Sequence, residues 1–508
     1  MHPTVFRSNW KIIEESDSEL AELKVLFVTS EVAPLIKTGG LADVSSALPA
    51  ALRAMGLDVH VLVPGYNQVI AQLMQYEVAA VFDNLPGFPS SRLLSSRMMH
   101  DVPLLVLDCP SLYQRDGGPY QDVTGHDWAD NALRFGLLSK VAAVLGSSAS
   151  PLGWHPDLVH CNDWQTGLTP AYLHFAQGAV PSIIAIHNLA FQGIFPPETV
   201  AQLGLPSSCF SIDGVEYYGN MSFLKAGLFY ADHITTVSPN YAKEIQQKEL
   251  GFGLQGLLSM RSGDLTGMLN GIDTEEWDPE TDPHLARQYS GADMTGKSAN
   301  KKALQIKLGL KTDPNVPLLG VVSRFTHQKG LDLLLEIAPR LTELPAQLVM
   351  LGNGDAHLQK TARDLSHRYP GMIGAVIGFS EDMSHQIEAG ADMFVMPSRF
   401  EPCGLNQLYS QRYGTPPIVH ATGGLSDSVV DCTSATLKDG TASGFMFDGM
   451  TAENLFITIQ RAIGLYHDKI KWETLCKNCM AKNFSWHSSA EACRAVYLKV
   501  LERSAEKT

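Results

Sequence analysis

Residues Val25–Asp43 read VLFVTSEVAPLIKTGGLAD, an apolar run followed by a polar loop with two adjacent glycines. The short apolar run is typical of a strand that is covered on both faces in a parallel sheet. A second segment, Ile418–Asp427 (IVHATGGLSD), repeats this arrangement near the other end of the chain. Paired glycines let a backbone approach a ligand closely, and the start of a helix favours an anion. The two copies predict facing loops across a cleft that binds a phosphorylated ligand.

Apolar runs alternate with helical segments through both halves of the chain. In the first half they cover residues 25–28, 59–63, 104–107, 158–160, 183–186 and 234–237. In the second half they cover residues 318–322, 347–351, 375–377, 393–396 and 418–419. Such alternation predicts parallel sheets whose functional loops follow the carboxyl ends of the strands. We expect an α/β fold of two tandem doubly wound domains, with a polar connection near residues 274–298.

The length and charge of the chain agree with a two-domain globular protein. Its 508 residues include 38 Lys and Arg against 53 Asp and Glu, a formal net charge of −15. Chains longer than about 250–300 residues tend to divide into domains. An acidic chain without a basic tract is a poor match for binding nucleic acid. No apolar run approaches the roughly 20 residues that span a membrane.

Residues 1–23 form an acidic extension that fits neither a secretory signal nor a transit peptide. We therefore expect a cytoplasmic protein that has no nucleic-acid or membrane partner. Among the eight cysteines, only Cys476 and Cys479 form a CxxC pair, and no second pair or suitably spaced histidine completes a zinc site. Two ordinary helix cysteines are favoured over a redox pair.

Three groups of polar residues follow predicted strands. Lys37 lies beside Gly39 and Gly40, where it would supply a cation to a phosphate or a sugar-ring edge, or would simply be a solvated lysine in a tight turn. Arg324 and Lys329 follow the strand at 318–322 and would converge on one diphosphate, with two surface cations as the alternative.

Glu401 follows the strand at 393–396, between Phe400 and Pro402. Its carboxylate would accept hydrogen bonds from sugar hydroxyls or stabilise a developing positive charge, or it would be an acid at a helix start. His187 also follows a strand, where a histidine is more often structural. The chain has neither HExxH nor GxSxG, which disfavours a hydrolase that depends on those motifs.

Together these segments resemble the bacterial glycogen synthases and the catalytic region of plant starch synthases. The resemblance extends in order from residue 24 to about 487. The stretches that carry it are Val28–Val44, His187–Gly193 (HNLAFQG), Ser222–Gly227 (SFLKAG), Leu269–Asp273 (LNGID), Val322–Leu331 (VSRFTHQKGL), Pro397–Leu408 (PSRFEPCGLNQL) and Ala421–Asp427 (ATGGLSD). These families are retaining glucosyltransferases of the GT-B fold, in which two Rossmann-like domains face each other across a cleft.

The resemblance implies transfer of glucose from ADP-glucose to the non-reducing end of an α-1,4-glucan, with retention of configuration and without a metal or other cofactor. The expected partners are thus a nucleotide sugar and a glucan polymer. The implied organisation is a first domain over residues 24–265, a nucleotide-sugar domain over 266–484, and a C-terminal helix over 485–508 that packs back on the first domain.

The resemblance also assigns roles to single residues. The catalytic residues would be Glu401, Arg324, Lys329, His187 and Lys37. The donor would be held by Lys37, Gly39, Gly40, Asn270, Arg324, Lys329, Phe379, Glu401, Tyr409, Thr422, Gly423 and Gly424, with Phe379 stacking on the adenine. The acceptor side would comprise Glu31, Asp43, Asp163 and Asn188. Tyr409 replaces a second glutamate that the wider superfamily places eight positions after the first.

Two alternatives stay open. One is a related GT-B transferase with another donor or a small acceptor, and the other is a catalytically weak glucan-binding or priming protein. The presence of Lys37, Arg324, Lys329 and Glu401 together favours an enzyme.

Overall fold

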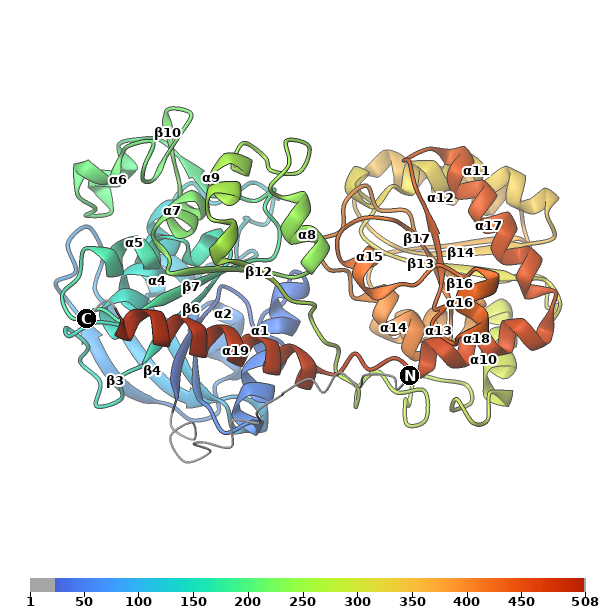
Figure 1. Cartoon of the computed structure of the whole chain (residues 1–508), viewed down its shortest axis with the longest axis horizontal. Coiled ribbons are helices and arrows are strands. Elements are labelled where there is room, and N and C mark those ends of the chain that lie inside the picture. The colour runs from blue at the N-terminus through green and yellow to red at the C-terminus, as the bar shows by residue number, and fades with distance from the viewer. Residues whose placement is uncertain (1–22, 507–508) are drawn as a thin grey trace, which may run out of the picture.

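The computed structural model describes residues 23–506, which form two lobes side by side (Figure 1). The expected extension over residues 1–23 lies outside the described residues except for Leu23. The first lobe contains a nine-stranded sheet and the second a six-stranded sheet, each with helices packed around it. The predicted α/β fold of two tandem doubly wound domains is confirmed.

The sheet of the first lobe has the order β12-β11-β7-β6-β1-β2-β5-β4-β3. The pairs β3–β4 and β4–β5 are antiparallel and the others are parallel. In chain order the strands are β1 (Lys24–Val28), β2 (Asp58–Pro64), β3 (Glu77–Phe82), β4 (Ser91–Arg97), β5 (Pro103–Asp108), β6 (Leu158–Asn162), β7 (Ser182–Ile186), β11 (His233–Thr236) and β12 (Leu265–Gly267). A small separate sheet pairs β8 (Ile194–Phe195), β10 (Asn220–Ser222) and β9 (Glu216–Tyr217).

The sheet of the second lobe has the order β15-β14-β13-β16-β17-β18, and its pairs are parallel. In chain order the strands are β13 (Leu318–Val322), β14 (Gln347–Gly352), β15 (Ile373–Ile377), β16 (Met393–Met396), β17 (Pro417–His420) and β18 (Phe445–Phe447). The strands predicted in the second half lie at these positions, and β18 was missed.

Helices follow most of the strands. In the first lobe they are α1 (Gly40–Ala54), α2 (Asn67–Gln72), α3 (Pro110–Tyr113), α4 (Asn131–Leu145), α5 (Leu168–His174), α6 (Thr199–Gln202), α7 (Phe223–Tyr230), α8 (Pro239–Glu244) and α9 (Gln255–Met260). In the second they are α10 (Thr295–Lys307), α11 (Leu331–Glu343), α12 (Ala356–Arg368), α13 (Glu381–Gly390), α14 (Asn406–Arg412), α15 (Gly423–Ser428), α16 (Ser434–Lys438), α17 (Ala452–Tyr466) and α18 (Lys469–Met480).

The last helix, α19 (Trp486–Ala505), returns to the first lobe (Figure 1). Its residues Cys493, Val496 and Tyr497 are buried in the core of that lobe. The Tyr497 hydroxyl lies 2.7 Å from Nδ1 of His160 on β6. Two chain segments therefore cross between the lobes, one between β12 and α10 and the other between α18 and α19. They contact each other where the Ile272 N–H donates to the carbonyl of Phe484 at 2.8 Å.

Each sheet changes its winding direction between two neighbouring strands. In the first lobe these are β1 and β6, and in the second they are β13 and β16. Loops diverge at such a point and leave a crevice beyond the carboxyl ends of the strands, which is where doubly wound proteins bind ligands. The topology therefore gives each lobe one crevice.

The described helices include none that is long and apolar enough to cross a membrane. The eight cysteines are free and buried, including Cys476 and Cys479 on α18. Burial raises the pKa of Cys476 to about 12, so its thiol is protonated and unreactive at neutral pH. The interpretation of this pair as ordinary helix cysteines agrees with that environment.

Candidate functional site

A cavity of about 940 Å³ lies between the lobes and is lined from both of them. It takes its walls from the segments that follow β1, β6 and β7 in the first lobe and β13 and β16 in the second. The predicted site residues that line it are Glu31, Gly39, Gly40, Asp163, His187, Asn188, Asn270, Arg324, Lys329 and Glu401. The parallel topology has thus brought together residues that are far apart in the sequence.

The carboxylate of Glu31 holds the glycine loop of the first lobe. It accepts hydrogen bonds from the Thr38 backbone N–H at 2.5 Å and hydroxyl at 2.6 Å, and from the Gly39 N–H at 3.3 Å. The Tyr120 hydroxyl donates to the same carboxylate. Hydrogen bonds to a charged group are the stronger kind, so this buried acid fixes the loop in place. A side chain added at Gly39 would point into open space.

Asp163 organises the segment that follows the neighbouring strand β7. Its carboxylate accepts hydrogen bonds from the backbone N–H groups of His187 at 2.7 Å and Asn188 at 3.4 Å. Burial raises the pKa of Asp163 to about 7, although these two hydrogen bonds oppose the shift. Burial also lowers the pKa of His187 to about 4, so its imidazole is neutral at pH 7.

The orientation of the His187 ring follows from its neighbour Asn162. The Asn162 amide N–H donates to the carbonyl of Val28 at 2.9 Å, which turns its carbonyl oxygen toward His187 Nε2, also at 2.9 Å. Nε2 therefore carries the proton and donates. His187 therefore lines the cavity with a ring that carries no positive charge.

Glu401 and Lys329 form an ion pair in the wall of the second lobe. Their Oε2 and Nζ atoms are 2.5 Å apart, and the two side chains are 7% and 17% exposed. The hydroxyl of Ser398 donates to the same oxygen at 2.9 Å. Arg324 also lines the cavity and is exposed, and among the described residues its guanidinium has no hydrogen bond or ion pair. Arg324 therefore brings an uncompensated positive charge to this wall.

The second Thr-Gly-Gly loop lies behind Glu401 and not in the cavity wall. The Gly424 N–H donates to the carbonyl of Glu401 at 3.0 Å, and a Cβ on Gly423 would lie 2.0 Å from the same oxygen. Its outer side faces the first lobe, where the carboxylate of Glu244 accepts from the Gly423 N–H at 2.9 Å and the Thr422 hydroxyl at 3.1 Å.

The second glycine loop therefore does not line the cavity opposite the first, and the donor contacts expected of Thr422, Gly423 and Gly424 stay predictions. The reason is that the loop after β17 packs directly on the backbone of the loop after β16, which leaves no space for a ligand between them. Gly423 and Gly424 are glycines because of this close approach, and they support Glu401 from behind.

Four further predicted residues do not line the cavity. Lys37 lies at its margin in an ion pair with Asp43, with 2.7 Å between Nζ and Oδ1. Burial alone would lower the pKa of Lys37, but Asp43, Glu381 and Glu276 together raise it. Phe379 follows β15 and is 77% exposed, whereas Tyr409 on α14 stacks on Trp277 at 3.8 Å. Their proposed contacts with the donor stay predictions.

The sequence reasoning missed the aromatic wall of the first lobe. Tyr120, Trp128, Trp164 and Phe191 line the cavity. Trp164 directly follows Asp163, a position that would have indicated it. Tyr120 and Trp128 belong to the segment between α3 and α4, which follows no motif and gave no such signal. Aromatic faces of this kind suit the apolar faces of sugar rings.

Two family models match the chain. The model described as starch synthase catalytic domain matches residues 24–260, and the model described as glycosyl transferases group 1 matches residues 301–461. The chain is 56% identical over 486 residues to a glycogen synthase from Nitrosospira multiformis, covering 95% of this chain and 98% of that protein. It is 57% identical to a glycogen synthase from Nitrosomonas eutropha, covering 96% and 98%.

A solved structure is similar over the same extent. The catalytic domain of starch synthase IV from Arabidopsis thaliana, bound to ADP and acarbose, has a TM-score of 0.82 and 30% sequence identity. The match covers 95% of this chain and 100% of that one. Sucrose-phosphate synthase from Thermosynechococcus elongatus shares the fold, with a TM-score of 0.58 at 17% identity. The predicted resemblance is confirmed, and the chain belongs to the glycogen synthase family, with the GT-B fold of two Rossmann-like domains.

Proposed function

We propose that this protein transfers glucose from ADP-glucose to the non-reducing end of an α-1,4-glucan, with retention of configuration and without a catalytic metal. The observation that carries the proposal is the composition of the interlobe cavity. One wall presents Arg324, Lys329 and Glu401, and the opposite wall presents the Gly39–Gly40 loop, His187 and a set of aromatic rings. The first set suits a sugar diphosphate, and the second suits sugar rings.

The two cations suit the leaving group of this reaction. Breaking a sugar–phosphate bond builds positive charge at the anomeric carbon and negative charge on the departing diphosphate. Cations that are already in place stabilise that negative charge without reorganisation, which is the most effective catalytic device at such a site. Arg324 is unpaired among the described residues and can contact the diphosphate directly. Lys329 contacts both Glu401 and the phosphate when the donor is bound, so its ion pair with Glu401 is weakened.

Glu401 then serves the sugar. Its carboxylate, released in part by Lys329, accepts hydrogen bonds from glucosyl hydroxyls and lies where positive charge develops. The neutral ring of His187 leaves its backbone carbonyl as the electron-rich group at that end of the cavity. The departing phosphate takes the proton of the acceptor hydroxyl on the same face, which retains the configuration. Closure of the two lobes excludes water and so limits hydrolysis.

The choice of ADP-glucose over other donors rests on relatives. The Arabidopsis starch synthase IV structure contains ADP, and that domain aligns with nearly the whole chain. An α-1,4-glucan acceptor is the substrate that the name glycogen synthase implies for the bacterial relatives. We infer the same pair of substrates for this chain.

The proposal is tested by incubating purified protein with glycogen and ADP-glucose labelled in the glucosyl group. Label is expected in the polymer, and UDP-glucose is expected to be a poor donor in a parallel reaction. Proton NMR of the first product is expected to show an α-linkage. Folded protein that transfers glucose from neither donor would overturn the proposal.

A further inference from the structure

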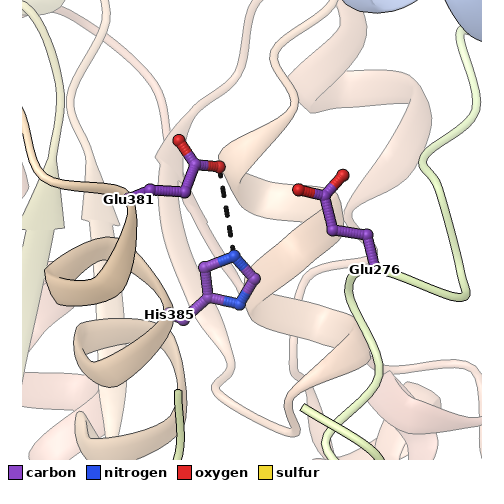
Figure 2. Close-up of side chains that lie close together, drawn as sticks. All are labelled: Glu276, Glu381 and His385. Atoms are coloured by element: carbon purple, nitrogen blue, oxygen red, sulfur yellow. Dashed lines mark ion pairs between the residues drawn. The ribbon is translucent and has the colours of Figure 1, made fainter. Parts of the chain in front are cut away.

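Two carboxylates and one imidazole meet outside the interlobe cavity. Glu381 and His385 lie one turn apart on α13, and Glu276 belongs to the segment that crosses from the first lobe to the second. Each side chain offers one atom such that all three atoms lie within 4.8 Å of one another. Figure 2 shows their polar ends turned toward one another. None of the three lines the cavity described above.

The orientation of the His385 ring leaves one nitrogen as a free acceptor. Its Nδ1 lies 2.8 Å from Oδ2 of Asp282, an oxygen that also accepts from the Tyr413 hydroxyl at 2.5 Å. A carboxylate accepts only, so Nδ1 carries the proton and Nε2 presents its lone pair.

That lone pair is buried and has no partner in the structure. His385 is 1% exposed, and its Nε2 has no hydrogen bond. The nearest carboxylate oxygen, Oε1 of Glu381, is 4.0 Å away, which is too long for a hydrogen bond. A buried polar atom without a partner costs free energy, so the site is incomplete as it stands.

Packing fixes the ring in this position. The indole of Trp277 stacks on the His385 ring with 3.8 Å between centroids and an interplanar angle of 12°. Trp277 is adjacent to Glu276, so the same short segment that supplies one carboxylate also holds the imidazole. The Asp282 hydrogen bond and the Trp277 stack leave Nε2 little freedom to turn toward another partner.

The charge at the site is also unbalanced. An oxygen of Glu276 and an oxygen of Glu381 lie within 4.8 Å of each other, with Glu276 exposed and Glu381 partly buried. The facing cation of the first lobe is Lys37, but its ammonium lies 2.7 Å from Asp43 and is engaged there. A cation placed between Glu276 and Glu381 would offset their repulsion and would complete the coordination of the buried nitrogen.

We propose that Glu276, Glu381 and Nε2 of His385 bind a divalent transition-metal ion, with zinc as the best match. One imidazole and two carboxylates suit a first-row metal ion better than magnesium or calcium, which prefer oxygen ligands alone. Asp282 supplies the carboxylate that usually holds the second nitrogen of a metal-bound histidine. Three protein ligands leave a fourth position of a tetrahedral zinc ion for water.

Such an ion fastens the interlobe segment to α13 at a point that faces Lys37 of the first lobe. It is separate from Arg324 and Lys329, so it has no part in neutralising the diphosphate. Sequence reasoning predicted no metal site, because the pattern Glu381-x-x-x-His385 is not a recognised motif by itself. The third ligand comes from a segment about a hundred residues away.

The test uses the full chain, stripped of metal and titrated with zinc in competition with a chromophoric chelator. One equivalent of zinc is expected to bind. Glu276→Gln and Glu381→Gln are each expected to weaken zinc binding at least tenfold. Glu275→Gln is the matched control, since Glu275 is the exposed neighbour of Glu276 and lies outside the cluster, and it is expected to bind as the unchanged chain does.

The ligand set is read independently by X-ray absorption at the zinc edge, where one imidazole and otherwise oxygen ligands are expected. A chain that binds no zinc stoichiometrically, a Glu276→Gln/Glu381→Gln double variant with unchanged affinity, or a spectrum with sulfur ligands would overturn the proposal. These measurements do not depend on glucosyl transfer, so their outcome is separate from that of the proposed function.

Discussion

The ion pair between Lys329 and Glu401 makes the proposed division of labour testable. If Lys329 serves the diphosphate and Glu401 serves the glucosyl group, the two residues must differ in their effect on binding of ADP, which has no glucosyl group. Lys329→Ala removes a charged hydrogen-bond donor to phosphate, which is worth about 1.5–3 kcal/mol. We expect ADP to bind roughly 10- to 150-fold more weakly, a factor of ten for each 1.4 kcal/mol.

Glu401→Gln is expected to act differently. The amide still accepts from Ser398, but a negative charge 2.5 Å from the Lys329 ammonium is gone. ADP binding should therefore be unchanged or tighter, because Lys329 is freed and a repulsion is removed. The catalytic rate should fall by about 10²–10³, equivalent to about 2.7–4 kcal/mol, as for other lost transition-state contacts of this kind.

Stability should change only moderately in both variants. The pair is largely buried, but Lys329 borders the cavity and water can reach the charge that remains. We expect a loss of about 1–3 kcal/mol, between the values for exposed and fully buried pairs. Calorimetric titration with ADP, steady-state kinetics and urea unfolding measure the three quantities.

A matched control lies in the same part of the second lobe. Asp332→Asn breaks the ion pair between Asp332 and Arg399, whose atoms are 2.6 Å apart and which does not line the cavity. It should leave ADP binding and turnover within twofold of the unchanged chain. Equal weakening of ADP binding by Lys329→Ala and Glu401→Gln would refute the assignment of separate roles, and unfolding of both variants would show that the pair is structural.

Three further predictions concern the support of the site and the buried thiols. The pKa of Asp163 is raised to about 7 in the folded chain, so the folded chain holds this proton more tightly than the unfolded chain does. The resulting stabilisation is complete below the ordinary pKa of 3.8 and is lost as the pH rises through about 7. The free energy of unfolding of Asp163→Asn, measured with urea, should therefore rise relative to that of the unchanged chain by about 2–3 kcal/mol from pH 5 to pH 8, at 1.36 kcal/mol per pH unit. A difference between the two chains that does not change with pH would contradict this. Gly423→Ala places a Cβ 2.0 Å from the Glu401 carbonyl oxygen at a φ of +44°, so it should lower the free energy of unfolding by about 2–6 kcal/mol and remove most of the activity. Gly39→Ala adds a Cβ with no atom within 4 Å and should leave the melting temperature unchanged. The cysteines should not react with a thiol reagent in the native protein, and eight should react after unfolding; rapid reaction of Cys476 or Cys479 in the native state would favour a redox role.

Local patterns were enough to predict most of the parallel strands of the two large sheets. Runs such as 318–322 and 393–396 are apolar throughout because both faces of these sheets are covered by helices, so the signal does not depend on register. Strands β3 and β4 at one end of the first sheet and β12 at its other edge were missed. Strands β3 and β4 pair in antiparallel fashion beyond the parallel part of the sheet, and β3 has only one buried residue, so neither strand shows the continuous apolar run of a strand covered on both faces.

The position of a site residue at the carboxyl end of a strand was also predictable. Glu31, Asp163, Arg324 and Glu401 each follow a parallel strand, and such ends gather at one edge of a sheet. The strands that precede them, β1 with β6 and β13 with β16, lie where the winding reverses. The order of strands in a sheet is set by contacts between distant segments. The sequence therefore indicated that these residues lie at the carboxyl ends of strands, but not which of those strands are neighbours.

The sequence by itself therefore determined the family, the fold of two domains, and Arg324, Lys329 and Glu401 as charged residues of the cleft. Only the tertiary structure decided how each of these residues is used. The two Thr-Gly-Gly loops are alike in sequence, yet one lines the cavity and the other lies behind Glu401 against Glu244. The physical reason is that the role of a glycine loop depends on which groups pack against its backbone. For the second loop these groups are the Glu401 carbonyl, which follows another strand, and the Glu244 carboxylate, which belongs to the other lobe.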